Sequence, residues 1–476
     1  MADMLNTLKH HWNVTNRREF FTRAGSGLAA VALAAMSDED ARAASADPLA
    51  PKQPHIPPRA KSVIWCFMEG GPSQVDLFDP KPLLDKLALQ PVPASFHPEQ
   101  LLTAQGAKPS DGLFPSRRQF KQHGQSGLWV SDWLPFIAEH ADDLAVIRSV
   151  TSDAVNHVGG VCQMNTGDIL AGRPSMGAWV TYGLGSARRN LPTFIVMQDD
   201  KEILGSVQNY GSGFLPATYQ GTLFRQGDTP ILNLKRPAGE SDAQQRSKLD
   251  FLSALNGIYG RDKGDDTEID ARTRSYELAY QMQSAAPEAV DLSKESEATK
   301  KLYGMDDPET AVYGTNCLMA RRLVEQGVTY VEVSLDGWDT HMNNFETLSQ
   351  RLLPELDKGM SALVSDLSRR GLLPTTTIVW MGEFGRTPRI NDKAGRDHWP
   401  RSWSVVVGGG GIKGGQTIGA TDTDGIDIVD RPIGVMDLMA TLTRTMGINL
   451  DTQFTTPRGR PIKIVDGGKP VSELFG

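Results

Sequence analysis

The chain has 476 residues and a formal net charge of −8, and no run of Lys or Arg lies outside its N-terminal region. This pattern excludes the basic footprint of a nucleic-acid-binding protein, and the lack of an internal repeat favours one large domain with insertions. Three cysteines, Cys66, Cys162 and Cys317, are far apart among apolar neighbours, so we expect buried thiols rather than disulfides or a C-x-x-C metal site.

The N-terminal segment has the parts of an export signal. Arg17 and Arg18 precede a weakly apolar Ala/Gly-rich stretch at Gly25–Met36, and small-x-small peptidase sites follow at 41–46. This order predicts a twin-arginine signal peptide over residues 1–46, contact with the twin-arginine translocation machinery, and a periplasmic or otherwise exported protein. An amphipathic helix with a chance Arg pair is the alternative. No later stretch is long and apolar enough for a transmembrane segment in the mature chain.

A Pro-rich lead-in at 47–60 is followed by alternating apolar runs and helical patterns, which we assign to one domain at 61–476. We expect buried strands at 62–68, 144–147, 193–197, 328–333, 377–381 and 403–407. We expect helices at about 311–326, 344–370 and 435–446. This alternation predicts an α/β fold, a doubly wound, mostly parallel sheet with helices on both faces.

Residues 205 to about 300 interrupt the alternation, because they are polar and rich in Gln, Asp, Ser and Arg. We interpret them as an insertion that is mostly helical after Gly239. A lid over the sheet edge is one role that such an insertion could have.

Polar residues follow the ends of several predicted strands. Glu69 to Ser73 follow the first strand, Asp336 to His341 follow the strand at 328–333, and Glu383 to Arg386 follow the strand at 377–381. Parallel strands share one carboxyl edge, so these loops are expected to meet at one crevice. Carboxylates and imidazoles gathered there would suit metal-assisted ester hydrolysis.

Within these loops, Asp339 and His341 are the first candidate metal ligands. Residues two apart in an extended segment point the same way, so both can reach one divalent ion at ~2.0–2.2 Å. An N-cap role for Asp339 beside an exposed His341 is the alternative. We expect a divalent metal ion, zinc in preference to calcium, magnesium or manganese.

Two further loops add charged candidates. Glu383 ends a core strand, where an unpaired carboxylate is costly, and Asp397 and His398 follow a dozen residues later. An ion pair of Glu383 with Arg386 or Arg396 is the alternative to a metal role.

A helix is predicted from near His157 to Gly167, with Asn156 before it. Its N-terminus would point toward the crevice and favour an oxyanion or an activated side chain there, although a plain helix start is the alternative. Arg173 lies a few residues beyond and would bind an anion bidentately or pin its loop.

These motifs resemble the alkaline phosphatase and sulfatase superfamily and, more closely, an exported group known as domain-of-unknown-function family 1501. The resemblance covers roughly residues 60 to 470. It depends on segments 67–76, 165–167, 172–175, 337–341, 382–388, 395–398 and 431–433, with the tail 456–461.

The resemblance implies particular site residues. Glu69 or Asp76 would take the first carboxylate position, Asp339 and His341 the next pair, Glu383 the second acidic position, and His398 the last ligand. Phe384 stands where the pattern expects a histidine, and His157 stands where related hydrolases carry Ser, Thr or Cys. Cys162 lacks the neighbours needed for conversion to formylglycine.

Three mechanisms stay open at this point. His157 could form a phospho-enzyme, water activated by the metal could attack directly, or Ser73 could serve as nucleophile. Arg386 and Arg396 would join Arg173 in binding the substrate.

The sequence therefore predicts an exported metal-dependent hydrolase of small or polymeric phosphate or sulfate esters. A binding or scaffold protein with a decayed site is the first alternative. A metal-dependent phosphotransferase or mutase is the second.

Overall fold

The computed structural model of the protein describes residues 48–88, 90, 112–113, 115–186, 188, 190–198, 204–225, 227, 230–231, 234–263, 267–456 and 459–476. The chain divides into two compact units, residues 1–50 and residues 51–476. The predicted signal peptide, residues 1–46, lies wholly outside the described residues, so it stays a prediction.

A nine-stranded sheet forms the centre of the 51–476 unit, in the order β14-β5-β13-β9-β1-β8-β6-β7, with β17 also paired to β5. The strands are β1 (Ser62–Met68), β5 (Leu144–Thr151), β6 (Phe194–Met197), β7 (Thr222–Phe224), β8 (Tyr330–Leu335), β9 (Thr376–Met381), β13 (Trp403–Gly409), β14 (Gln416–Ile418) and β17 (Ile433–Gly434). All neighbours are parallel except that β13 is antiparallel to β5 and β9. The predicted fold class is confirmed.

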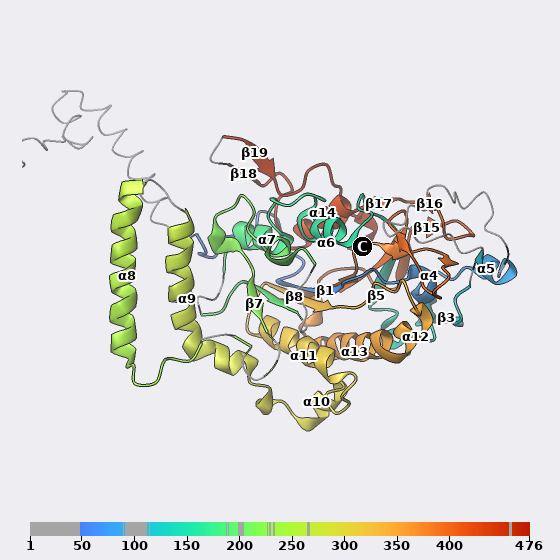
Figure 1. The fold of residues 1–476 in the computed structure, drawn as a ribbon, viewed down its shortest axis with the longest axis horizontal. Helices are drawn as coiled ribbons and strands as arrows, with labels where there is room; N and C mark the ends of the chain where they lie inside the picture. Colours follow the sequence, from blue (N-terminus) through green and yellow to red (C-terminus); the bar gives the residue numbers. More distant parts are fainter. Residues whose placement is uncertain are drawn as a thin grey trace, which may run out of the picture. The chain divides into compact units, whose positions relative to one another are not determined.

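Helices cover both faces of this sheet (Figure 1). α6 (His157–Thr166), α7 (Met176–Leu184) and α14 (Val435–Thr445) lie along one face, and α11 (Ala311–Glu325) and α13 (Leu353–Arg369) along the other. Every residue of β1, β8 and β9 is buried, as continuous apolar runs between two helical layers require. The three cysteines are free and buried, as predicted.

The helix predicted at 344–370 is divided into α12 (Asn344–Thr347), a π-helical turn (Leu348–Leu352) and α13. Pro354 explains the division. It lies in the first turn of α13 and has no N–H to continue the preceding ladder of hydrogen bonds.

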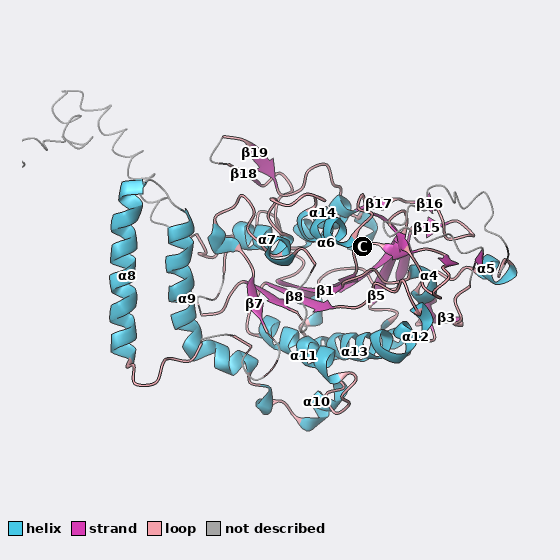
Figure 2. Cartoon of the chain, in the orientation of Figure 1, coloured by secondary structure: helices cyan, strands magenta, loops and turns pink. Residues whose placement is uncertain are grey.

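The insertion contains α8 (Asp242–Lys263) and α9 (Thr267–Val290), which pack on each other (Figure 2). α9 also contacts α11, and α10 (Glu297–Leu302) lies between α9 and α11 in the chain. The prediction of helices after Gly239 is therefore confirmed, while the lid role stays a prediction. No helix among the described residues is long and apolar enough to cross a membrane.

Shorter elements complete the unit. They are α4 (Gln74–Leu77), α5 (Pro82–Lys86), β2 (Gly112–Leu113), β3 (Phe120–His123), β4 (Leu128–Ser131), β10 (Gly385–Arg386), β11 (Arg389–Ile390), β12 (His398–Trp399), β15 (Ala420–Thr421), β16 (Ile428–Asp430), β18 (Gln453–Thr455) and β19 (Pro461–Lys463). Of these, β10 and β12 pair with each other and so fix the loop after β9 to the segment before β13.

Candidate metal centre

Loops from five strands meet at one edge of the sheet. β1, β5, β8 and β9 all end at this edge because they run in the same direction. β13 is antiparallel, so the residues just before it, including His398, reach the same edge. The mixed sheet therefore gathers the loops that the sequence analysis singled out.

Four side chains converge there: His157, Asp339, His341 and His398, which we call the metal-ligand cluster. One donor atom from each lies within 4.8 Å of the other three. Asp339 Oδ1 is 3.0 Å from Nε2 of His157, 3.2 Å from Nε2 of His341 and 3.4 Å from Nε2 of His398. Three imidazole nitrogens thus surround one carboxylate oxygen.

Each histidine is held through its other ring nitrogen. Nδ1 of His157 is 2.5 Å from Glu383 Oε1, and Nδ1 of His341 is 2.8 Å from Asp397 Oδ1. Nδ1 of His398 lies 2.9 Å from the carbonyl oxygen of Val155. Because the Nδ1 atom of each histidine faces an acceptor, each ring can carry its proton on Nδ1. The Nε2 lone pair of each ring is then available to a metal, as in carboxylate–histidine–zinc arrangements.

The cluster fits a divalent metal ion on the geometry of its own atoms. The buried Nε2 of His157 has no hydrogen-bond partner among the described residues, although Asp339 Oδ1 is close. Nε2 of His341 lies 2.9 Å from Nε2 of His398, which sets two lone pairs against each other unless a proton or cation lies between them. A tetrahedral zinc with bonds of ~2.0–2.2 Å has donors roughly 3.3 Å apart, close to these separations. Three imidazoles and one carboxylate are a typical zinc donor set.

Charges around the cluster shift several pKa values. Burial acts to lower the pKa of His157, but the carboxylates of Asp339 and Glu383 outweigh it and raise that pKa to about 9. Burial acts to raise the pKa of Asp339, but the imidazoles of His157 and His398 and the Arg386 guanidinium hold it far below its usual range. Burial and the Arg386 charge lower the pKa of His398. In the metal-free protein near neutral pH, Asp339 is therefore ionised, His157 is an imidazolium and His398 is a neutral imidazole.

Glycines allow these loops to approach one another. Gly70 has a φ of +116°, and a Cβ there would lie 2.2 Å from the backbone nitrogen of Asp339. A Cβ on Gly160 would lie 2.9 Å from Cβ and Cγ of Glu383. The turn after β1 therefore brings its backbone close to the backbone of the Asp339 loop.

The structure places Asp76, Ser73 and Arg396 apart from the cluster. Asp76 is fully buried and accepts from Arg396 Nε at 2.8 Å and Nη2 at 3.0 Å. Ser73 Oγ donates to Asp76 at 2.6 Å. Because Arg396 also donates to the carbonyls of Thr387 and Pro388, it ties two loops together and has no exposed surface for a substrate. We do not include these three residues in the site.

Arg386 is also buried, and it supports the cluster from within. Its Nη2 is 2.7 Å from Asp339 Oδ1, and its other nitrogens donate to carbonyls of the loops, including Gly71 and Arg396. Glu69 is buried as well, and its Oε2 accepts from the N–H of Leu204 at 3.1 Å. Neither residue belongs to the four-atom cluster.

The remaining candidates have separate roles. α6 begins at His157 and ends before Gly167, as predicted, and the Asn156 side chain caps it by accepting from Gly159 N at 3.0 Å. Arg173 is partly exposed and lies 3.9 Å from Asp168 and 3.7 Å from Asp466. Glu383 and Asp397 lie behind the ligands, as the partners of His157 and His341.

Two residues of this centre escaped the sequence analysis. Asn391 donates to the carbonyl of His341 at 3.0 Å and to Asp397 at 3.1 Å, and Arg389 pairs with Asp397 at 3.2 Å. Their position between Glu383 and Asp397 was the available signal. Phe384, expected at a ligand position, is buried and lies against the rings of His157 and His398, with centroid distances of 5.0 and 4.6 Å.

Comparisons with known proteins give one broad match and several distant ones. The family described as "Protein of unknown function (DUF1501)" matches residues 60–475. None of the curated proteins matches the chain. Distant solved structures include Ps i-CgsB (10% identity, TM-score 0.37, covering 82% of this chain and 72% of that one), the PsFucS1 sulfatase from Pseudoalteromonas sp. (12%, 0.32, 66% and 62%) and the alkaline phosphatase from the Antarctic bacterium TAB5 (10%, 0.30, 77% and 96%).

Proposed function

The chain belongs to the DUF1501 family of proteins of unknown function, and from its metal-ligand cluster we propose that it is a metal-dependent hydrolase of phosphate or sulfate esters. The observation that carries this proposal is the convergence of three histidine Nε2 atoms on Asp339 Oδ1. The motif resemblance supports the choice of phosphate or sulfate esters.

A bound divalent ion would supply a Lewis acid for the ester oxygens and would lower the pKa of bound water toward ~7. The chain's own residues hold the donors in place. Asp397 and Glu383 fix two imidazole rings, and Arg386 fixes Asp339. The Asp339 side chain is 38% exposed, so the cluster opens to solvent on that side.

We propose that water, not a side chain, attacks the ester. His157 has Glu383 at Nδ1 and the cluster at Nε2, so it has no free nitrogen for a phospho-enzyme. Ser73 is buried and donates to Asp76. A phosphotransferase or mutase would transfer the group to an added alcohol, and we expect transfer to water alone.

Three residues with exposed apolar side chains adjoin cluster residues in the chain or through the backbone. Val158 and Met342 adjoin His157 and His341 in the chain, and the carbonyl of Val155 accepts from His398. All three side chains are exposed. We therefore propose that the substrate is an ester whose alcohol part is apolar or aromatic, since such a group would cover these exposed side chains.

The test uses purified protein supplied with zinc, manganese, magnesium or calcium and a panel of aryl and alkyl phosphate and sulfate esters. We expect turnover that is lost in His341→Ala and kept in His123→Ala, a matched change on β3. Metal-bound protein that turns over no ester, yet is stabilised by phosphate or sulfate, would favour the binding or scaffold alternative.

Export through the twin-arginine pathway is part of the proposal, on the sequence of residues 1–46. Replacing Arg17 and Arg18 together with lysine should leave the protein in the cytoplasm. Unchanged fractionation between cytoplasm and periplasm would contradict this part alone.

A further inference from the structure

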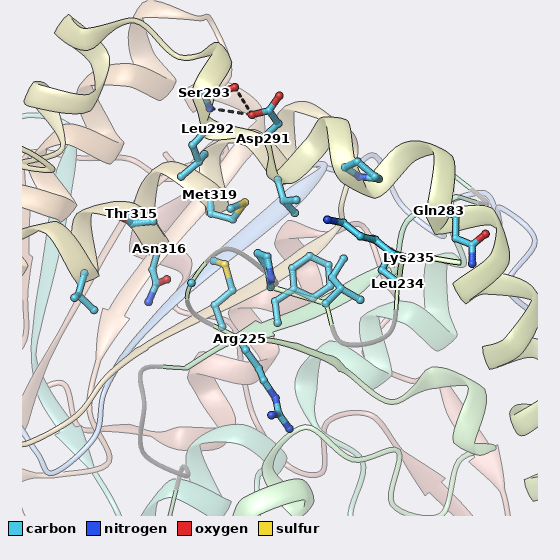
Figure 3. A pocket seen from close by; sticks show the side chains of 18 of the residues that line it. Arg225, Leu234, Lys235, Gln283, Asp291, Leu292, Ser293, Thr315, Asn316 and Met319 are labelled. Atoms are coloured by element: carbon cyan, nitrogen blue, oxygen red, sulfur yellow. Dashed lines mark hydrogen bonds between the residues drawn. The ribbon is translucent and has the colours of Figure 1, made fainter. Parts of the chain in front are cut away.

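A cavity away from the metal-ligand cluster lies at the opposite end of the sheet order from β14, beside the edge strand β7 (Figure 3). Its volume is about 1120 Å³. The walls come from the ends of β6 and β7, the segment after β7, the last turns of α9 and the first half of α11. We call it the edge pocket. None of its lining residues belongs to the metal-ligand cluster.

Most of the wall of the edge pocket is apolar. Met197, Phe224 and Met319 are buried members of the main hydrophobic core, and Ile231 and Leu234 pack against that core from the segment after β7. A cavity with apolar walls and a volume slightly above the usual range of about 300–1,000 Å³ has room for an organic ligand. The walls favour an occupant with an apolar body.

Two amide atoms in the wall lack hydrogen-bond partners among the described residues. They are Nδ2 of Asn316, whose side chain is on α11, and Oε1 of Gln283 on α9. Asn316 is 7% exposed, so its unpaired amide carries a desolvation cost that a ligand oxygen would remove. Pro287, also in the wall, has no N–H for the carbonyl of Gln283 one turn earlier.

The charged side chains around the pocket are mostly cationic. Lys235, Arg225 and Arg236 all line it, and Figure 3 shows Lys235 directed toward the middle of the pocket. Among the lining residues that the structure describes, only Asp291 is acidic, and it accepts from the N–H and hydroxyl of Ser293, which lowers its pKa and turns it toward its own loop. The ammonium of Lys235 therefore faces a region with room for an anion.

We propose that the edge pocket binds an amphipathic organic anion, a carboxylate with a long apolar chain. The chain lies on Phe224, Met319 and Leu234, and the carboxylate accepts from Lys235, while Asn316 lies on the other side of the pocket, beside the body of the ligand (Figure 3). This site is separate from the proposed hydrolase centre, so it stands or fails independently of that function.

Isothermal titration of the full chain with sodium dodecanoate, below its micellar concentration, tests the proposal. We expect one binding site. Lys235→Ala should raise the Kd at least about tenfold, as the loss of a charge-assisted hydrogen bond does, whereas Asn316→Leu, on the other side of the pocket, should raise it less. Lys294→Ala is the matched control, because Lys294 is exposed next to Ser293 but does not line the pocket.

Three related probes with the same chain length measure which head groups the edge pocket binds. Dodecyl phosphate measures tolerance for another anion, and dodecanol and dodecylammonium should bind at least about tenfold more weakly than dodecanoate because they cannot pair with Lys235. Thr315→Trp, which puts an indole into the cavity, should abolish binding while thermal unfolding stays cooperative. Absence of dodecanoate binding to the unaltered chain, or equal binding by all variants and head groups, would overturn the proposal.

Discussion

The metal-ligand cluster and the edge pocket use buried polar groups in opposite ways. In the cluster, each histidine is fixed from behind, and Asn391 uses its amide on two partners. In the edge pocket, the amide nitrogen of Asn316 has no partner within the described part of the chain, and many of the surrounding side chains are apolar. Both asparagines are more than nine-tenths buried.

The difference shows which kind of ligand each region is built for. A metal ion needs donors that are already oriented, because its bonds are short and directional. An organic anion needs volume, apolar contact and one or two free polar atoms. A satisfied network behind converging donors therefore indicates an ion, while an unsatisfied amide in a roomy apolar wall indicates a molecule.

The largest effect that would break this contrast is removal of a ligand. His341→Ala should reduce bound metal from about one equivalent to background and lower affinity by more than about 100-fold, since it removes a direct donor. Metal content by mass spectrometry measures this, with His123→Ala as the control. Equal metal content in the two variants would show that the cluster is not a metal site.

The next effect concerns the residues behind the ligands. Asp397→Asn removes the charge that orients His341, so metal affinity should fall about 10–100-fold without loss of the fold. A chelator competition assay measures the affinity. Asp392→Asn, an exposed acid in the same loop, is the matched control and should leave it unchanged.

The pH dependence of metal binding is expected to be somewhat smaller. The pKa of His157 in the metal-free protein is raised to about 9 from its ordinary 6.5, so its stabilising proton is fully bound below about pH 6.5 and is lost as pH rises through about 9. Metal binding must displace that proton, so affinity should rise about tenfold from pH 7 to pH 8. Titrations in buffers of different ionisation enthalpy should show release of about one proton; none released would contradict this assignment.

The smallest expected effect sharpens the comparison most. Asn316→Leu should stabilise the ligand-free protein by about 1 kcal/mol. The substitution replaces an unpaired buried amide with an apolar side chain of similar shape. Asn391→Leu should destabilise the protein by about 1–3 kcal/mol, because it removes the hydrogen bonds that the Asn391 amide donates to the buried His341 carbonyl and to Asp397. Denaturant unfolding compares the two variants. The same sign for both would remove the distinction between the regions.

The sequence predicted the sheet well because β1, β8 and β9 are buried on both faces and therefore read as unbroken apolar runs. It also named all four cluster residues, since each follows or precedes a core strand. The sequence did not distinguish the metal ligands from the residues that hold those ligands in place. Asp76 and Glu383 carry the same chemistry as Asp339, and only the fold shows that Asp76 pairs with Arg396 while Glu383 holds His157.

The edge pocket could not be predicted in this way. Asn316 and Lys235 occur in segments with no motif, and they become neighbours of one cavity only through the packing of α9 and α11 beside β7. An unpaired amide is a property of surroundings and not of a residue type. A site of this kind can be recognised only from a three-dimensional structure.

The most direct test of the central claim is an anomalous-scattering map from crystals of the metal-loaded protein. We predict one strong peak within bonding distance of Nε2 of His157, His341 and His398 and of Asp339 Oδ1. A peak bound by other residues, or no peak in protein that contains one metal equivalent per chain, would contradict the account.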